Sequence, residues 1–314
     1  MSSPSRFDVL ISEVGPRDGL QSISATMSTA HKCAWIDGLV ASGLQEIEVG
    51  SFVSPKLLPQ MADAAQVVAH AITHSGVTVM ALVPNIKGAE AAMRAGVHKI
   101  TLPVSASPAH SMANVRKTPQ QMVEEVRAVA QLRDSLAPQV HIEAGISTAF
   151  GCTLQGQVPE DDVIALAVAC VAAGANESGL SDTTGMANPA QVKRLFTRLR
   201  SELGDHAGAA HMHNTRGLGL ANCLAAYEAG VLTFDSSQAG LGGCPYAPGA
   251  SGNVVTEDLV FMFEAMGIRT GIDIERLLAA RNALAAGLPG EALYGMLPPA
   301  GLPKGFVPHP YSTH

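Results

Sequence analysis

The chain has 314 residues, of which 47% are hydrophobic, and it carries a formal net charge of −7. This content supplies a large core, while an acidic balance without blocks of Lys or Arg argues against a nucleic-acid partner. No apolar run reaches the roughly 18 residues of a membrane span, and the five scattered Cys and the absence of a signal or transit peptide lead us to expect a cytoplasmic protein without a disulfide framework.

Short apolar runs rich in β-branched residues recur along the chain and predict strands. In chain order the expected strands span 7–15, 44–50, 77–83, 98–104, 140–147, 176–181, 209–214 and 232–237.

The segments between these runs predict helices. They span 29–42, 57–73, 86–95, 119–136, 161–173, 189–203 and 217–229, and a further helix is expected near 274–287. Gly43, Gly96, Gly174 and Gly230 follow four of them, and Gly at this place supplies the left-handed turn that stops a helix. The tail over 295–314 is predicted to be extended and partly disordered.

Strands that alternate with helices predict a parallel sheet covered by helices. Eight such units favour a closed (β/α)8 barrel, and an open doubly wound sheet is the alternative. We expect the whole chain, 1–314, to form a single domain, with the barrel over about 7–270 and a C-terminal helix and tail over 271–314.

A barrel of this kind carries its catalytic side chains at the carboxyl ends of several strands. Polar residues stand at those ends here: Arg17 and Asp18, Glu48 and Ser51, Asn85, Ser105, Ser147, Asp182, and His211 and His213. Glu residues also stand at inward-compatible positions: Glu13, Glu46, Glu48, Glu143 and Glu177. Because buried acidic groups need partners, we expect a polar, hydrogen-bonded lumen.

His211 and His213 are separated by one residue, so both face the same side of a strand. Two imidazoles at this spacing supply half of a mononuclear metal site. The alternative is a pair of hydrogen-bonded histidines inside a polar barrel.

Asp18 and Arg17 follow the first strand in the segment Pro-Arg-Asp-Gly. A carboxylate ligand beside a guanidinium suits a reaction that develops an oxyanion. The alternative is a turn held by an ion pair, because this segment is also good turn chemistry. Glu48 and Asp182 either join the catalytic network or hydrogen-bond a loop.

The loop 240–253 contains five Gly and two Pro. So many glycines allow close approach of the backbone to a ligand, and mobility. Cys244 stands in the middle of this loop and is either a reactive group of the site or an inert thiol; Asn253 stands at its end.

With these residues assembled, the chain resembles the 3-hydroxy-3-methylglutaryl-CoA lyase family of metal-dependent (β/α)8 enzymes, over roughly 8 to 290. The segments that carry the resemblance are EVGPRDGLQ, IEVGSFVSPKLLPQMAD, VPNIKG, GLSDTTGMANP, HMHNTRGLGLAN and AGLGGCPYAPGASGNVVTEDLVFM. Condensing relatives usually have Glu where this chain has Leu20, and they lack the Cys-containing loop.

The resemblance implies an acyl-CoA substrate and a divalent cation, Mg2+ or Mn2+. By this resemblance, the ligands of the metal are Asp18, His211, His213 and Asn253, and Arg17 stabilises the enolate oxygen. Glu48 and Asp182 belong to the catalytic network, and Cys244 lies on the loop that closes over the substrate. We expect Arg17, Gln21, Asn85, Gly145 and Ser147 to contact the substrate. The implied reaction is a retro-Claisen cleavage that releases acetyl-CoA. Asp18 and His211 are both candidates for its base, and Cys244 or a water for its proton donor.

Three departures from the family pattern fall where the acyl group should bind or beside the metal. Asn214 stands where the lyases usually have Asp, Gly145 where Tyr is common, and the segment 103–119 differs throughout. The acyl group therefore stays open between 3-hydroxy-3-methylglutaryl-CoA, which would yield acetoacetate, (R)-citramalyl-CoA, which would yield pyruvate, and a longer-chain 3-hydroxyglutaryl-CoA. Two other functions compete with the lyase: a condensing acyltransferase, and a non-catalytic barrel that binds a metal or CoA. We also expect the chain to form a homo-oligomer, either a dimer or a tetramer.

Overall fold

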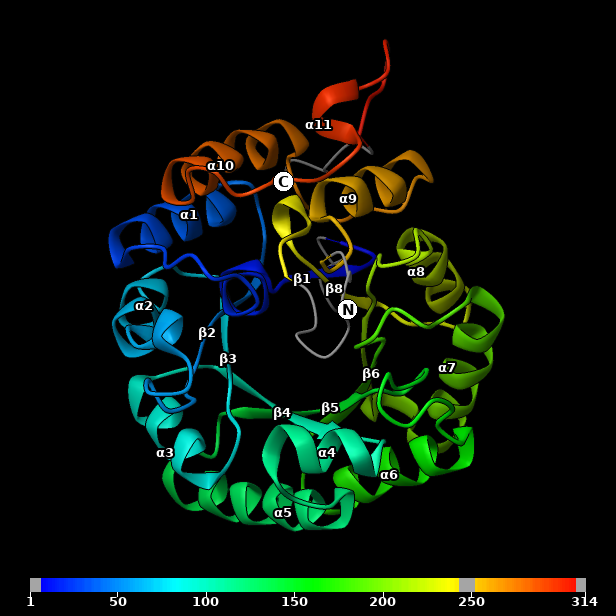
Figure 1. Cartoon of the computed structure of the whole chain (residues 1–314). Helices are drawn as coiled ribbons and strands as arrows, with labels where there is room; N and C mark the ends of the chain where they lie inside the picture. Colours follow the sequence, from blue (N-terminus) through cyan, green and yellow to red (C-terminus); the bar gives the residue numbers. More distant parts are fainter. Residues whose placement is uncertain (1–6, 243–251, 309–314) are drawn as a thin grey trace, which may run out of the picture.

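Eight parallel strands form a closed barrel in the order β1 to β8, with β8 paired to β1. The computed structural model describes residues 7–242 and 252–308. Figure 1 shows the strands as an inner ring and the helices as an outer ring. The predicted (β/α)8 barrel is confirmed, and the open sheet is excluded. The strands are β1 Leu10–Glu13, β2 Glu46–Ser51, β3 Thr78–Leu82, β4 Lys99–Ser105, β5 His141–Ser147, β6 Glu177–Ser181, β7 Ala207–His211 and β8 Thr233–Ser236.

The helices of the described residues include every predicted one, in the predicted order. They are α1 Thr29–Ala41, α2 Ala64–Ala71, α3 Ile86–Ala95, α4 Pro108–Val115, α5 Pro119–Leu136, α6 Glu160–Ala172, α7 Pro189–Leu203, α8 Gly219–Glu228, α9 Thr256–Ala265, α10 Ile274–Gly287 and α11 Leu297–Ala300. Short turns of helix are η1 Gly15–Gly19, η2 Pro59–Met61, η3 Gly204–His206 and η4 Gln238–Gly240. No helix in the described part of the chain is long and apolar enough to cross a membrane.

Glycine ends helices where the sequence predicted it. Gly43, Gly96, Gly174 and Gly230 have φ angles of 100°, 92°, 110° and 90°. A side chain with a Cβ rarely adopts this conformation. These glycines follow α1, α3, α6 and α8. The bounds of α3, α5, α7 and α10 match their predictions.

The prediction of one helix over 57–73 is wrong in its first half. Pro59 begins a single 3-10 turn, and α2 starts only at Ala64. Asp63, just before α2, binds the neighbouring helix α1: its carboxylate accepts hydrogen bonds from Thr29 Oγ1 at 2.7 Å and Lys32 Nζ at 2.6 Å. This tie to α1 fixes where α2 begins.

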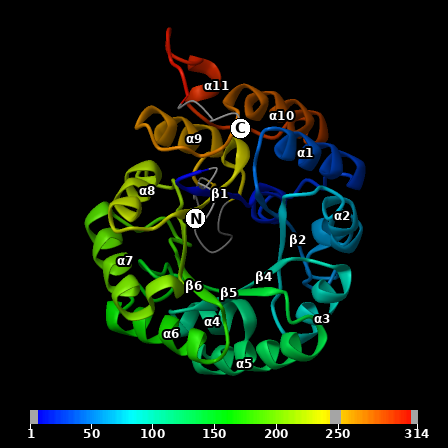
Figure 2. The same ribbon diagram turned by 180° about the vertical axis from the view of Figure 1, so that it is seen from behind.

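Three further segments differ from prediction, the first being α9, where no helix was predicted. The stretch after β4 contains the helix α4, which was not predicted; Ser107 caps it by accepting a hydrogen bond from His110 N, and Pro108 occupies its first turn. The tail is not simply extended, because α11 forms there and Leu297 is buried. Figures 1 and 2 place α11 outside the ring, beside α9 and α10.

The strands divide their side chains between two environments. Outward residues such as Ile47, Ile100, Ile142 and Phe234 are fully buried beneath the helices and form the core. Inward residues are mostly polar or small, whereas an ordinary barrel is filled with Val, Ile and Leu. This sequence pattern leaves the carboxyl end of the barrel hollow.

The predicted partners of the buried acidic groups are present. Lys99 on β4 lies 2.8 Å from Glu143, 2.6 Å from Glu177 and 3.6 Å from Glu46. Glu13 accepts hydrogen bonds from the backbone N–H of Gly15 and Gln238 and from Thr256 Oγ1. The polar lumen is therefore confirmed.

Candidate active site

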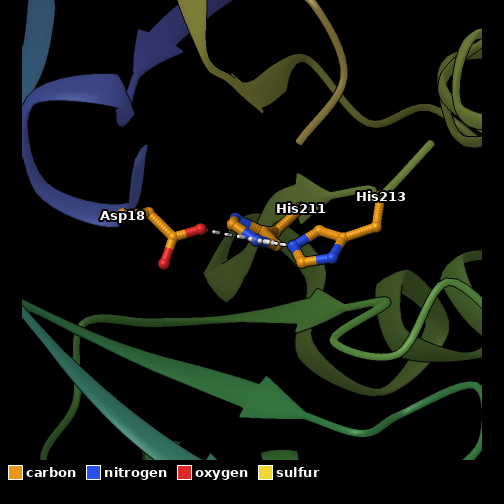
Figure 3. A group of neighbouring side chains, drawn as sticks. All are labelled: Asp18, His211 and His213. Atoms are coloured by element: carbon orange, nitrogen blue, oxygen red, sulfur yellow. Dashed lines mark hydrogen bonds and ion pairs between the residues drawn. The ribbon is translucent and has the colours of Figure 1, made fainter. Parts of the chain in front are cut away.

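Asp18, His211 and His213 converge at the carboxyl end of the barrel (Figure 3). Asp18 comes from η1 after β1, His211 ends β7, and His213 follows two residues later. One ligand atom of each lies within 4.8 Å of the others. His211 Nε2 is 3.8 Å from Asp18 Oδ2 and 3.1 Å from His213 Nε2. Residues almost two hundred positions apart thus form one cluster, as the strand-end pattern predicted.

The turn η1 presents Arg17 and Asp18 because its glycines allow close packing. A Cβ on Gly15 would lie 2.5 Å from Glu13 Oε1, and one on Gly19 would lie 2.7 Å from the Cβ of Leu241. Only glycine fits at both places. The segment predicted as strand up to residue 15 therefore ends at Glu13 and continues as a wide helical turn.

Asn253 approaches the same cluster from the far end of the Gly-rich segment. Its Nδ2 donates to Asp18 Oδ2 at 2.6 Å, and its backbone pairs with that of His213. The buried Oδ1 of Asn253 has no hydrogen-bond partner among the described residues. The cluster therefore offers two imidazole nitrogens, a carboxylate and an amide oxygen that accepts no hydrogen bond. This set of ligands fits a divalent cation.

Arg17 is buried and clamped by two carboxylates. Its Nε donates to Glu48 Oε2 and its Nη1 to Asp18 Oδ1, both at 2.5 Å. Burial alone would lower the pKa of Arg17, but the charges of Asp18 and Glu48 raise it. Burial likewise opposes the ionisation of Asp18, yet the charge of Arg17 lowers the pKa of that carboxyl to about 2. The pair therefore stays charged at neutral pH.

Asp235 on β8 is a member of the site that sequence reasoning missed. Its Oδ2 lies 3.0 Å from His211 Nδ1, so it fixes the orientation of that ring and leaves Nε2 directed at the cluster. Burial alone would lower the pKa of His211, but the hydrogen bond and charge of Asp235 raise it. A single carboxylate inside a predicted strand carries no spacing signal, and only the pairing of His211 with Asp235 across β7 and β8 reveals it.

The protonation of His213 differs from that of its neighbour. Burial and the charge of His211 lower the pKa of His213 to about 4. At neutral pH its ring is consequently uncharged, as a metal ligand must be.

A cavity of about 770 Å³ opens above this cluster. Most of the predicted site residues line it: Arg17, Asp18, Gln21, Glu48, Asn85, Gly145, Ser147, His211 and His213. Its mouth also includes His110, Arg116 and Lys117 of α4 and the segment that follows. The family pattern places the segment 103–119 beside the acyl group, but the sequence predicts no helix there and singles out none of these three residues.

Two predicted residues have local structural roles. Asn85 caps α3, since its Oδ1 accepts from the backbone N–H of Lys87 and Gly88 at 3.1 Å. Asp182 is buried and does not line the cavity; its Oδ1 accepts from the backbone N–H of Met186 at 2.8 Å and Ala187 at 3.1 Å. The alternative in which Asp182 holds a loop is thus the one that these contacts favour. Cys244 lies outside the described residues.

The inner part of the cavity is lined by small side chains. A Cβ on Gly145 would have Thr101 Cγ2, at 3.7 Å, as its one neighbour within 4 Å. A Cβ on Gly179, by contrast, would lie 2.5 Å from the backbone oxygen of Ala209. There is therefore room for a Cβ at Gly145, whereas at Gly179 the neighbouring backbone excludes one.

The HMGL-like family model matches residues 8–284 of the chain. The 3-hydroxy-3-isohexenylglutaryl-CoA/hydroxymethylglutaryl-CoA lyase of Pseudomonas aeruginosa is 41% identical over 278 residues, covering 88% of this chain and 92% of that protein. The (R)-citramalyl-CoA lyase of Chloroflexus aurantiacus is 40% identical over 305 residues, covering 93% and 95%.

Solved structures show the same likeness. An HMG-CoA lyase from Acinetobacter baumannii, in complex with coenzyme A and 3-methylmalate, is 39% identical and superimposes with a TM-score of 0.90. The superposition covers 99% of this chain and all of that one.

Proposed function

The chain belongs to the HMGL-like family and is a carbon–carbon lyase of acyl-CoA esters, and we propose that it cleaves 3-hydroxy-3-methylglutaryl-CoA or a close analogue with the help of a divalent cation. The products would be acetyl-CoA and a keto acid, acetoacetate for the parent substrate. The observation that carries this proposal is the convergence of Asp18, His211 and His213 beside the guanidinium of Arg17 on one cavity.

Asp18, His211, His213 and Asn253 would hold the cation, which we propose to be Mg2+ or Mn2+. When bound, such an ion supplies a Lewis acid that acidifies a hydroxyl group and neutralises developing negative charge. Asp235 keeps His211 in the orientation that this site requires.

Two residues are in place to accept the proton of the substrate's tertiary hydroxyl. Asp18 is ionised at neutral pH. In His211, Nδ1 is held by Asp235, so Nε2 serves either as a ligand of the cation or as the base, and not as both at once. Loss of this proton lets the carbon–carbon bond break and the keto acid leave. The electron pair of the broken bond stays on the thioester fragment, which becomes an enolate. Asp18 and His211 both remain candidates for the base.

Arg17 would stabilise the enolate oxygen. Its guanidinium lines the cavity, and Glu48 and Asp18 hold it in one orientation before substrate binds. A preoriented donor of this kind lowers the energy of the transition state because it needs no rearrangement when the charge develops. Protonation of the enolate carbon then gives acetyl-CoA, and we propose Cys244, or a water, as the donor.

The acyl group is the less defined half of the substrate. The open space at Gly145 admits a substituent larger than methyl, as the 3-hydroxy-3-isohexenylglutaryl-CoA activity named for the Pseudomonas relative would require. The Chloroflexus relative, named for (R)-citramalyl-CoA, keeps that substrate as an alternative. A condensing acyltransferase is less favoured, because the matched relatives are named as lyases.

The test is an incubation of purified protein with Mg2+ and a panel of 3-hydroxyacyl-CoA esters, with identification of the keto acid released. Acetyl-CoA with acetoacetate, pyruvate or a longer 3-oxo acid identifies the substrate. Failure to cleave any member of the panel would contradict the proposal. We also propose a cytoplasmic homo-oligomer, which sedimentation analysis and fractionation would test.

A further inference from the structure

A second group of metal-binding side chains lies on the outer ring, between α1 and α2. Asp37 belongs to α1, His70 to the last turn of α2, and His74 to the turn that follows. His70 Nε2 is 2.6 Å and His74 Nε2 is 2.8 Å from the same oxygen, Asp37 Oδ1. Among the described residues, this is the one group of ligand-type side chains besides the active-site cluster whose donor atoms all lie within 4.8 Å of one another.

The backbone brings these three side chains together. The chain turns directly after α2, where the backbone N–H of His74 donates to the carbonyl oxygen of Ala71 at 3.1 Å, and this turn brings the ring of His74 beside that of His70. Asp37 closes the third side from the neighbouring helix, and Figures 1 and 2 both show α1 and α2 side by side. The two rings are edge-on to each other, with an interplanar angle of 77°, and both direct Nε2 to the carboxylate.

The surroundings favour a cation at this point. The carboxyl end of a helix carries partial negative charge, and both histidines lie at the end of α2 beside the charge of Asp37. The side chains are 34%, 26% and 49% exposed for His70, His74 and Asp37, so an ion can enter from solvent and keep water ligands.

The group is separate from the active site. The ends of α1 and α2 lie at the opposite end of the barrel from the carboxyl ends of the strands, because the helices run antiparallel to the strands they cover. None of the three residues lines the cavity. Ligands at that end of a barrel serve stability and not turnover.

We propose that Asp37, His70 and His74 form a second, structural metal site that binds a zinc-class transition-metal ion and joins α2 to α1. Two imidazoles and one carboxylate suit Zn2+, Co2+ or Ni2+, whereas Mg2+ prefers an all-oxygen set. An ion that binds the folded state alone stabilises it by mass action.

The first test counts zinc ions bound to untagged, metal-free protein at equilibrium. His74→Gln should bind one ion fewer than its parent both in the wild-type chain and in a His213→Ala background, where the active-site cluster is already broken. Asp37→Asn is the second variant, and it should also bind one zinc ion fewer than its parent. His206→Gln is the matched control, since His206 is an exposed histidine that contacts the backbone oxygen of Asn176 and belongs to no such group. Equal counts in His74→Gln and its parent would overturn the proposal.

The second test is thermal unfolding in the His213→Ala background. Zn2+ should raise the melting temperature by a few degrees, Mg2+ should not, and His74→Gln should abolish the effect of zinc. An unchanged melting temperature would contradict a structural role. Lyase activity of His74→Gln with Mg2+ should equal that of the wild type, so this proposal fails or holds independently of the proposed function.

Discussion

The Nε2 atoms of His211 and His213 face each other at 3.1 Å, with Asp18 Oδ2 3.8 Å from the first of them. At most one proton fits between the two rings, and the pKa of His213 is lowered to about 4 by burial and the charge of His211. The lone pair of His213 is therefore available at neutral pH. A cation bound here would replace the proton that otherwise separates two facing nitrogens.

Asp235 should govern the metal affinity without touching the metal. In Asp235→Asn the carboxylate that orients His211 is lost, and we expect the dissociation constant for Mn2+ to rise about 10–100-fold. Excess Mn2+ should restore most of the turnover. Isothermal titration and kcat at saturating metal measure the two effects separately, and a loss of kcat that metal does not restore would contradict this role.

The same contact predicts a pH dependence. Asp235 raises the pKa of His211 against the opposing effect of burial, and a proton on His211 Nε2 competes with the metal. Apparent Mn2+ affinity should therefore fall as pH falls through this raised pKa. In Asp235→Asn the fall should begin at a lower pH; a profile with the same midpoint would show that another group controls it.

Arg17→Lys should lower kcat by about 10²–10³-fold, while KM changes little. Lysine keeps the charge but loses the planar fork that contacts Glu48 and Asp18 at once. Steady-state kinetics with saturating Mg2+ provides the measurement. Arg94→Lys, an exposed arginine paired with Glu90 on α3, is the control and should leave kcat unchanged. A higher KM at constant kcat would assign Arg17 to binding alone.

Gly145→Tyr should narrow the acyl end of the cavity. A Cβ on Gly145 would make an ordinary contact with Thr101 Cγ2 at 3.7 Å, and Gly145 lines the cavity, so we expect the ring to occupy part of it. The ratio kcat/KM should fall more for substrates with a bulky substituent on C3 than for the methyl substrate. Gly208→Ala is the comparison: Gly208 does not line the cavity and its Cβ would lie 3.0 Å from the backbone nitrogen of Gly179, so this change should lower stability without changing selectivity. Equal losses for all substrates in Gly145→Tyr would place the acyl group elsewhere.

Lys99→Met should destabilise the fold. Lys99 pairs with Glu143 and Glu177 inside the barrel, and its removal leaves the buried Glu143 without the ammonium group that it contacts at 2.8 Å. Removing one partner of a buried pair costs about 3–5 kcal/mol of unfolding free energy. Chemical denaturation measures it. The matched surface change, Arg94→Met, removes an exposed pair and should shift stability by about 0.5 kcal/mol or less.

The fold was readable from the sequence wherever local chemistry acts alone. Glycines with positive φ, such as Gly96, end helices, and short apolar runs rich in β-branched residues marked all eight strands. Prediction was wrong at α2, because Asp63 binds α1 and α2 begins late, and at α4, because the local cap of Ser107 lies in a stretch dominated by turn-like residues. Such contacts leave no periodic pattern.

The site was readable to a similar extent. Strand ends placed Asp18 with His211 and His213 because strand order alone determines which ends meet. Asp235 escaped because its role depends on the register between β7 and β8. Asp182 also holds a loop and Asn85 also caps a helix, and the roles predicted for them in catalysis and substrate binding stay predictions.

The most direct test of the account is acetyl-CoA release from 3-hydroxy-3-methylglutaryl-CoA by wild-type and His213→Ala protein, each measured with Mg2+, with Mn2+ and after EDTA. The wild type should release acetyl-CoA only with a cation, and His213→Ala should release essentially none under any condition, while circular dichroism shows it folded. Full activity of EDTA-treated His213→Ala would contradict the account.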